Sequence, residues 1–159
     1  MVATGGVDGS LCLWDTFKAR ILKRLHLAEQ SLLCCKKGSA SKRKNCAILS
    51  IAFSPNGQIL ASGSEDGKIV FWRVETLTHI KTLQQHLGRV TAVVFGHDSK
   101  LFVSGGSDKT IRVWNLSTFS ETSCLSAHAD GGVTTLCLSA DGKSLASGSE
   151  DSTIKLWDF

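Results

Sequence analysis

The sequence has only one proline, and its longest uninterrupted apolar runs, such as Leu32–Cys35 and Ala92–Phe95, have four residues. A helix that crosses a membrane needs about 20 apolar residues, so we expect no transmembrane segment and no membrane partner. Residues 1–25 lack the basic start and the apolar stretch of a signal peptide, and we expect none. With 42% apolar residues, the composition excludes a collagen-like or disordered chain and is typical of a globular protein.

The six cysteines include no Cys-x-x-Cys pair and are too sparse for a disulfide scaffold. This predicts free thiols in an intracellular protein, either cytoplasmic or nuclear. His26, Cys34, Cys35 and Cys46 lie close together in the sequence and raise zinc as an alternative. Structural zinc sites usually pair ligands about two to four residues apart, which the adjacent Cys34 and Cys35 do not match. We therefore expect no metal and no cofactor.

One short pattern occurs four times. It opens the chain at Val2–Trp14 and returns at Leu60–Trp72, Phe102–Trp114 and Leu145–Trp157, each time with a hydroxyl residue before glycine, then an aspartate and a final tryptophan. The tryptophans are 58, 42 and 43 residues apart, so one unit has about 42 residues and the first interval holds an insertion at residues 29–44. A period of this length is typical of a repeat architecture.

Within each unit the apolar pattern predicts β-strands. A β-branched first strand ends at a turn such as Pro55-Asn56-Gly57, whose Asn-Gly supplies the positive φ that a two-residue hairpin turn requires. A second strand ends at the repeated hydroxyl residue, a third alternates apolar residues up to the tryptophan, and a looser fourth follows. This predicts about 14 antiparallel strands and almost no helix. The first strands are Ile48–Phe53, Val90–Phe95 and Val133–Leu138; the second end at Ser62, Ser104 and Ser147; the third carry Leu11/Leu13, Ile69/Phe71, Ile111/Val113 and Ile154/Leu156; the fourth lie near residues 20–25, 77–83 and 119–125.

Four antiparallel strands in a unit of about 42 residues, closed by Trp14-Asp15, Trp114-Asn115 or Trp157-Asp158, resemble the WD40 repeat of β-propellers. The resemblance covers all of the chain except residues 29–44. It departs from the family pattern at Arg73, which stands where aspartate is usual, and at His86 and His128, which no glycine precedes.

The resemblance implies an all-β fold class, with WD40-type β-propeller blades of four antiparallel strands in an open partial ring. WD40 propellers most often have seven blades, which would need about 290 residues, and the chain has 159. We therefore expect residues 1–159 to be part of a larger propeller, with the remaining blades in cis, or a truncated gene product. The alternative is that a second copy in trans completes the ring. The expected blades are about 1–28, 45–84, 87–126 and 130–159, with 29–44 as a basic loop insertion.

Repeated serine, histidine and aspartate residues could be mistaken for hydrolytic triads. A catalytic set occurs once, in a pocket with an exposed nucleophile, whereas these residues recur with the repeat and have no Gly-x-Ser-x-Gly elbow. We expect no enzyme activity. The resemblance implies instead a buried hydrogen-bond network with tryptophan. Two sets are complete (His86, Ser104, Asp108, Trp114 and His128, Ser147, Asp151, Trp157), and two lack the histidine (Ser62, Asp66, Trp72 and Thr4, Asp8, Trp14).

The resemblance further implies a non-enzymatic scaffold for protein–protein interaction, with loops that contact peptide segments of partner proteins. The alternative is a nucleic-acid or chromatin-associated factor, because residues 18–44 hold nine basic residues and one acidic residue. No aromatic residue lies between 29 and 44 to stack on a base, so a solvated loop is also consistent. Implied contact residues are Val7, Glu65, Ser107 and Glu150, with Leu87, Arg89 and Asp130; the basic loop residues are Lys36, Lys37, Lys42, Arg43 and Lys44.

Overall fold

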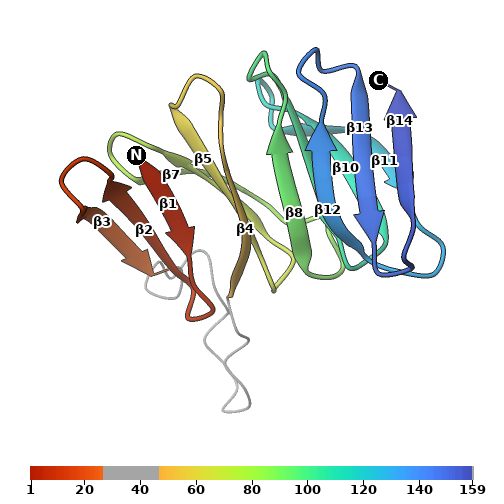
Figure 1. Ribbon diagram of the computed structural model, residues 1–159, viewed down its shortest axis with the longest axis horizontal. Helices are drawn as coiled ribbons and strands as arrows, with labels where there is room; N and C mark the ends of the chain where they lie inside the picture. Colours follow the sequence, from red (N-terminus) through yellow and green to blue (C-terminus); the bar gives the residue numbers. More distant parts are fainter. Residues whose placement is uncertain (27–46, 159) are drawn as a thin grey trace.

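The computed structural model describes residues 1–26 and 47–158, and every regular element in these ranges is a β-strand. Fourteen strands form four antiparallel sheets, which stand side by side in an open arc (Figure 1). The predicted all-β fold and its 14 strands are therefore confirmed. No helix in the described ranges has the length and apolar character needed to cross a membrane.

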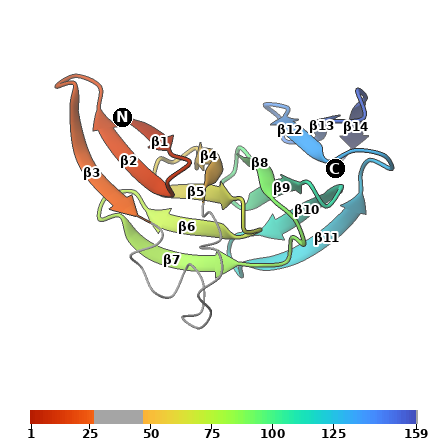
Figure 2. The ribbon, with the colours of Figure 1, turned by 90° about the horizontal axis from the view of Figure 1, so that it is seen from below.

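The order of the strands in each sheet follows the order of the sequence. The second and third sheets have four strands each, and the first and fourth have three. In Figure 2, β4, β8 and β12 lie on the inner side of the arc, and β3, β7 and β11 lie on its outer side. The sheets comprise β1 (Val2–Gly5), β2 (Ser10–Asp15) and β3 (Arg20–His26); β4 (Ile48–Phe53), β5 (Ile59–Ser64), β6 (Ile69–Arg73) and β7 (Thr78–Leu83); β8 (Val90–Phe95), β9 (Leu101–Gly106), β10 (Thr110–Asn115) and β11 (Ser120–Ser126); and β12 (Val133–Leu138), β13 (Ser144–Ser149) and β14 (Ile154–Asp158).

The predicted ends of the second strands are wrong by two residues. Ser62, Ser104 and Ser147 lie inside β5, β9 and β13, because the ladder of backbone hydrogen bonds continues through the glycine that follows each serine. Gly63, for example, pairs with residues of both neighbouring strands. The serine hydroxyl therefore projects from the middle of a strand, where neighbouring strands and sheets surround it.

The turn prediction also needs correction. The turn between β4 and β5 spans residues 54–58 and is thus longer than two residues. In it, Gly57 has a φ of 68°, and its N–H donates to the carbonyl of Ser54. Two of the fourth strands begin one residue later than predicted, at Thr78 and Ser120. The reason is that Leu77 and Phe119 adopt positive φ values of 50° and 53° and belong to the preceding turns.

The repeated glycine allows neighbouring sheets to approach closely. An ideal Cβ placed on Gly105 would lie 2.6 Å from Cγ1 of Val133, which is the first residue of the next sheet's inner strand. A side chain there would push the two sheets apart, and this explains why glycine follows the hydroxyl residue in the units that a further described sheet follows. An ideal Cβ on Gly5 would likewise clash with the Ile48 side chain, and one on Gly63 would lie 2.6 Å from Cγ1 of Val90.

Apolar residues of one sheet pack against the tryptophan face of the next. Ile69 and Phe71 of β6 form a cluster with Phe102 and Trp114 of the third sheet, and the Phe71 and Phe102 rings meet edge to face at 4.9 Å. The same arrangement joins the first sheet to the second and the third to the fourth. Ile154 and Leu156, the residues of the fourth sheet that correspond to Ile69 and Phe71, are each 79% exposed. No sheet of the described chain covers them. The arc is thus open at this face.

We predict that Gly105→Ala lowers the free energy of unfolding by about 1–3 kcal/mol, since overpacking a tight contact forces the backbone to shift. Gly148→Ala is the matched control, because its Cβ would meet only threonines of its own sheet and its effect should be smaller. Urea unfolding followed by circular dichroism measures both. Equal midpoint shifts would show that the approach of the next sheet does not constrain this glycine.

Candidate functional site

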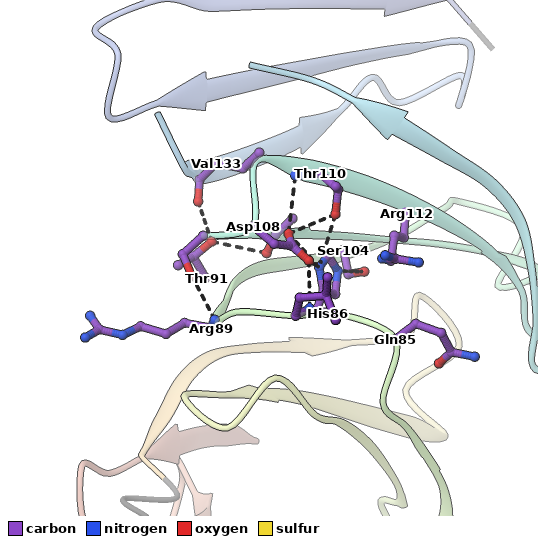
Figure 3. A network of polar contacts seen from close by, with 12 residues as sticks. Gln85, His86, Arg89, Thr91, Ser104, Asp108, Thr110, Arg112 and Val133 are labelled. Atoms are coloured by element: carbon purple, nitrogen blue, oxygen red, sulfur yellow. Dashed lines mark hydrogen bonds and ion pairs between the residues drawn. The ribbon is translucent and has the colours of Figure 1, made fainter. Parts of the chain in front are cut away.

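A buried hydrogen-bond network lies in the third sheet (Figure 3). The indole Nε1–H of Trp114 donates to Oγ of Ser104 over 2.9 Å, and this oxygen lies 2.8 Å from Nε2 of His86. On the other side of the imidazole ring, Nδ1 lies 2.9 Å from Oδ2 of Asp108. The His86 side chain has no exposed surface, and Asp108 is 8% exposed.

The direction of each hydrogen bond follows from its partners. An ionised carboxylate only accepts, so the Asp108 contact assigns the proton to Nδ1 of His86. On the other side of the ring, Nε2 faces the Ser104 hydroxyl, whose oxygen accepts from Trp114. Every polar atom of the network has a partner in this arrangement, and a single orientation of the imidazole ring results.

Asp108 also binds the backbone of the exposed segment before β8. Its Oδ2 accepts from the backbone N–H of Leu87 at 2.9 Å, and its Oδ1 accepts from the Thr110 hydroxyl at 2.8 Å. Burial raises the pKa of this carboxyl, but the hydrogen bonds from His86, Leu87 and Thr110 outweigh it and hold the pKa well below its usual range. The charged form is therefore the stable one, and it fixes both the buried imidazole and the surface segment.

The fourth sheet contains the same network. Nδ1 of His128 lies 3.1 Å from Oδ2 of Asp151, and Nε2 lies 3.0 Å from Oγ of Ser147, which also accepts from Trp157. The hydrogen bond from the Thr153 hydroxyl lowers the pKa of Asp151 most, and burial opposes it. Together with further hydrogen bonds, including the one from His128, the net effect is a pKa of about 2.

The second sheet holds a shorter version without histidine. Nε1 of Trp72 donates to Oγ of Ser62 at 3.1 Å. Asp66 instead accepts from the Ser64 hydroxyl at 2.6 Å and forms an ion pair with Nζ of Lys68 at 2.9 Å. Among the described residues, none joins the tryptophan–serine pair of this sheet to its aspartate through an imidazole.

The first sheet has the tryptophan–hydroxyl contact and an exposed ion pair. Trp14 donates to the hydroxyl of Thr4 over 3.0 Å. Asp8 accepts from the backbone N–H of Ser10 at 2.9 Å and meets Arg24 at 3.4 Å, where both side chains are 53% exposed. This turn is therefore held by local and solvent-exposed contacts.

The candidate contact residues all lie on one side of the arc, which we call the loop face. It comprises the β1–β2, β5–β6, β9–β10 and β13–β14 turns and the described segments that lead into β4, β8 and β12, and it lies at the lower side of Figure 1. Nε of Arg89 lies 3.5 Å from Oε1 of Glu65, and the backbone N–H of Arg89 donates to Oγ of Ser107 at 2.9 Å. Val7 is 82% exposed and Leu87 is 94% exposed, while Asp130 and Glu150 are exposed beside the fourth sheet.

Sequence reasoning missed two sets of residues near this face. Leu49, the second residue of β4, is 41% exposed there and occupies the position that Thr91 and Thr134 hold in β8 and β12. Hydroxyl groups also connect neighbouring inner strands: Ser50 accepts from the backbone N–H of Val93 at 3.1 Å, and the Thr91 hydroxyl donates to the carbonyl of Val133. Alignment of the inner strands by the repeat period would have shown Leu49 as an apolar residue at a position where the other strands have threonine, but the hydroxyl contacts depend on the neighbouring sheet.

Some predicted features lie outside the described residues. These are the basic loop residues Lys36, Lys37, Lys42, Arg43 and Lys44, and the cysteines Cys34, Cys35 and Cys46 of the zinc alternative. Within ranges 1–26 and 47–158, no three histidine, cysteine, aspartate or glutamate side chains gather in a way that could hold a metal ion.

Residues 34–73, 77–115 and 119–158 match the family model described as "WD domain, G-beta repeat". The two later matches each begin with the outer strand of one sheet and continue through the first three strands of the next. The match unit is thus offset from the sheet by one strand.

Similar proteins come from yeast and plants. The chain is 35% identical to Protein hir1 of Schizosaccharomyces pombe over 77 residues, which is 46% of this chain and 8% of that protein. It is 33% identical to WD repeat-containing protein VIP3 of Arabidopsis thaliana over 95 residues, 60% of this chain and 29% of the relative. It is 32% identical over 90 residues to the U3 snoRNP-associated protein-like YAOH of Oryza sativa subsp. japonica, 56% of this chain and 18% of the relative. The chain thus spans less than a third of each relative.

We predict that Asp108→Ala and Asp151→Ala destabilise the protein more than Asp66→Ala does. The first two changes leave a buried imidazole without its partner, which for Asp108 should lower the free energy of unfolding by about 1–3 kcal/mol. Among the described residues Asp66 meets Ser64 and Lys68, and the Ser64 hydroxyl keeps a second partner, the carbonyl of Lys68, when the carboxylate is removed. Urea melts of the three variants measure the effect, and equal midpoint shifts would contradict this account of the network.

Proposed function

The chain belongs to the WD40 repeat family, and from this premise we propose that it is a non-enzymatic scaffold that binds segments of partner proteins at its loop face. The observation that carries the proposal is the double role of Asp108, which holds the buried His86 ring and the backbone of the exposed Leu87. Binding at a segment whose backbone is already fixed does not have to order that backbone, and this lowers the entropic cost of binding. The loop face is in this respect preorganised for contact.

The environment of the network supports a structural role over a catalytic one. Ser104 and Ser147 are fully buried, and each hydroxyl already accepts a hydrogen bond from a tryptophan. A nucleophile has to reach its substrate, and these two hydroxyls have no surface from which to do so. The same atoms instead connect strands within each sheet.

An intracellular location, cytoplasmic or nuclear, agrees with free cysteines at positions 12, 124 and 137 and with the rice relative, whose name associates that protein with the U3 snoRNP.

The second candidate function is that of a nucleic-acid or chromatin-associated factor that uses residues 36–44, supported by the excess of basic residues in the sequence there. Binding of a polyanion weakens steeply with added salt. A complex at the loop face that persists in high salt therefore favours the scaffold.

We also propose that the four sheets are blades of a larger ring, with limits near 1–28, 45–84, 87–126 and 130–159 and the basic insertion at 29–44. Ile154 and Leu156 support this, since their counterparts in the other three sheets are covered by a neighbouring sheet. The covering sheet belongs to further blades in cis or to a second copy in trans.

The scaffold proposal predicts that Leu87→Ala with Arg89→Ala reduces the capture of partner proteins from a cell extract by at least about fivefold, because exposed anchor residues carry most of the binding energy. Quantitative mass spectrometry of proteins bound to the tagged chain measures the effect. Phe17→Ala is the control, since Phe17 is 98% exposed but lies in the β2–β3 turn, away from the loop face. Equal capture by both variants would overturn the proposal.

The ring proposal predicts that the 159-residue chain, expressed alone, self-associates at micromolar concentration. Each half-exposed aliphatic side chain forfeits roughly 1 kcal/mol of burial, and the unpaired edge of β14 can template association. Sedimentation velocity measures the mass, and Leu156→Lys should reduce association because it places a charge on the open face. A monomer that binds no hydrophobic dye would show that the arc is stable without a further sheet on its open face, and would contradict the ring proposal.

A further inference from the structure

Three exposed apolar side chains lie on or beside the loop face. Of the ten large apolar side chains that are exposed among the described residues, most belong to the first sheet or to the open face of the fourth. Val7 at the tip of the β1–β2 turn and Leu87 in the segment before β8 lie on the loop face, and Leu49, the second residue of β4, lies beside it. Leu49 and Leu87 lie between sheets that are both present, so a missing neighbouring sheet does not account for their exposure.

The backbone holds all three at fixed positions. The N–H of Ile48, next to Leu49, donates to the carbonyl of Gly6, next to Val7, at 3.0 Å. This bond places Val7 and Leu49 at the same junction, between the first and second sheets. Leu87 is fixed through its own N–H by Asp108. The backbone at or next to each of these side chains is therefore held in place, and the side chains themselves face solvent.

The chemistry of the loop face changes along the arc. The residue before the turn aspartate is Val7 in the first sheet, Glu65 in the second, Ser107 in the third and Glu150 in the fourth. Arg89 pairs with Glu65, which leaves the middle of the face close to neutral.

The fourth-sheet end of the loop face is acidic. Glu150 is joined there by the exposed Asp130, and neither forms an ion pair with another described residue within 4.0 Å. The nearby amine of Lys109 donates to the carbonyl of Ala129 and keeps its positive charge, so two exposed carboxylates stand beside one ammonium group. The loop face is therefore apolar at one end and acidic at the other.

We propose that the loop face binds an extended segment of a partner protein that is apolar at one end and basic at the other. An aliphatic side chain of the segment packs on Val7 and Leu49, and its backbone crosses the Glu65–Arg89 pair and Leu87. A lysine or arginine then meets Asp130 and Glu150. This inference rests on the proposed scaffold function, for which it names the chemistry of the partner.

The test uses the 159-residue chain and fluorescein-labelled synthetic peptides that carry Leu-Leu at one end, Lys-Lys at the other and a Gly-Ser spacer, in both directions. Two further peptides replace Lys-Lys by Gln-Gln or Leu-Leu by Ser-Ser. Fluorescence polarisation should show the amphipathic peptide, in one direction, binding at least about tenfold more tightly than either substituted peptide.

Variants of the chain locate the binding. Leu49→Thr and Glu150→Ser introduce residues that equivalent positions of other sheets already hold, so the fold should tolerate both. We expect Leu49→Thr to weaken binding of both leucine-containing peptides by about five- to tenfold. Glu150→Ser should weaken the lysine-containing peptides alone and reduce the salt dependence of their binding.

The control is Asp141→Asn, in the β12–β13 turn at a cavity of about 290 Å³ that it lines with His97 and Asp98. It removes a carboxylate away from the loop face and should change nothing. Equal affinity for all peptides, or equal losses with Asp141→Asn, would overturn the inference. If the Leu87 and Arg89 variant loses its partners while no peptide binds, the scaffold function stands and the partner chemistry is wrong. If neither effect occurs, both proposals fail.

Discussion

The close contact between one sheet's glycine and the next sheet's first β-branched residue determines how the whole arc is built. Gly5, Gly63 and Gly105 each receive an isoleucine or valine at a distance that leaves no room for a Cβ. This contact sets the separation at which apolar pairs such as Ile69 and Phe71 reach the tryptophan face of the following sheet. A single three- or four-stranded sheet cannot bury its own apolar face, so the stability of every unit depends on its neighbours.

The buried network and the loop face are parts of one structure. The carboxylate of Asp108 orients the His86 ring inside the sheet and also fixes the backbone of Leu87 at the surface. The second and first sheets lack the histidine, and the aspartates of their turns form ion pairs with Lys68 and Arg24. The Asp66–Lys68 pair is nearly as buried as Asp108, whereas both partners of the Asp8–Arg24 pair are half exposed. Salt should therefore weaken the ion pair of the first sheet most.

The periodic features of the fold could be predicted from the sequence, and the features that depend on a neighbouring sheet could not. The spacing of the tryptophans and the alternation of Ile111 and Val113 depend on local pattern alone, and they predicted the number and order of the strands. The extension of β9 beyond Ser104 follows from pairing through Gly105, which requires the position of two other strands. The exposure of Leu49 and the Ser50–Val93 hydrogen bond arise where separate units meet, and no single repeat contains that information.

The offset between the sequence match and the sheet affects how such a chain can change in length. Each of the two later matches supplies the outer strand of one sheet and the three inner strands of the next, so the covalent chain crosses every boundary between these sheets. If a gene duplicates one such unit, the new copy completes the sheet before it and begins the sheet after it, and no strand is left without a partner. Units can therefore be added or lost one at a time, and each change alters the number of blades by one. The boundary between two such units lies inside a sheet, between its third and fourth strands.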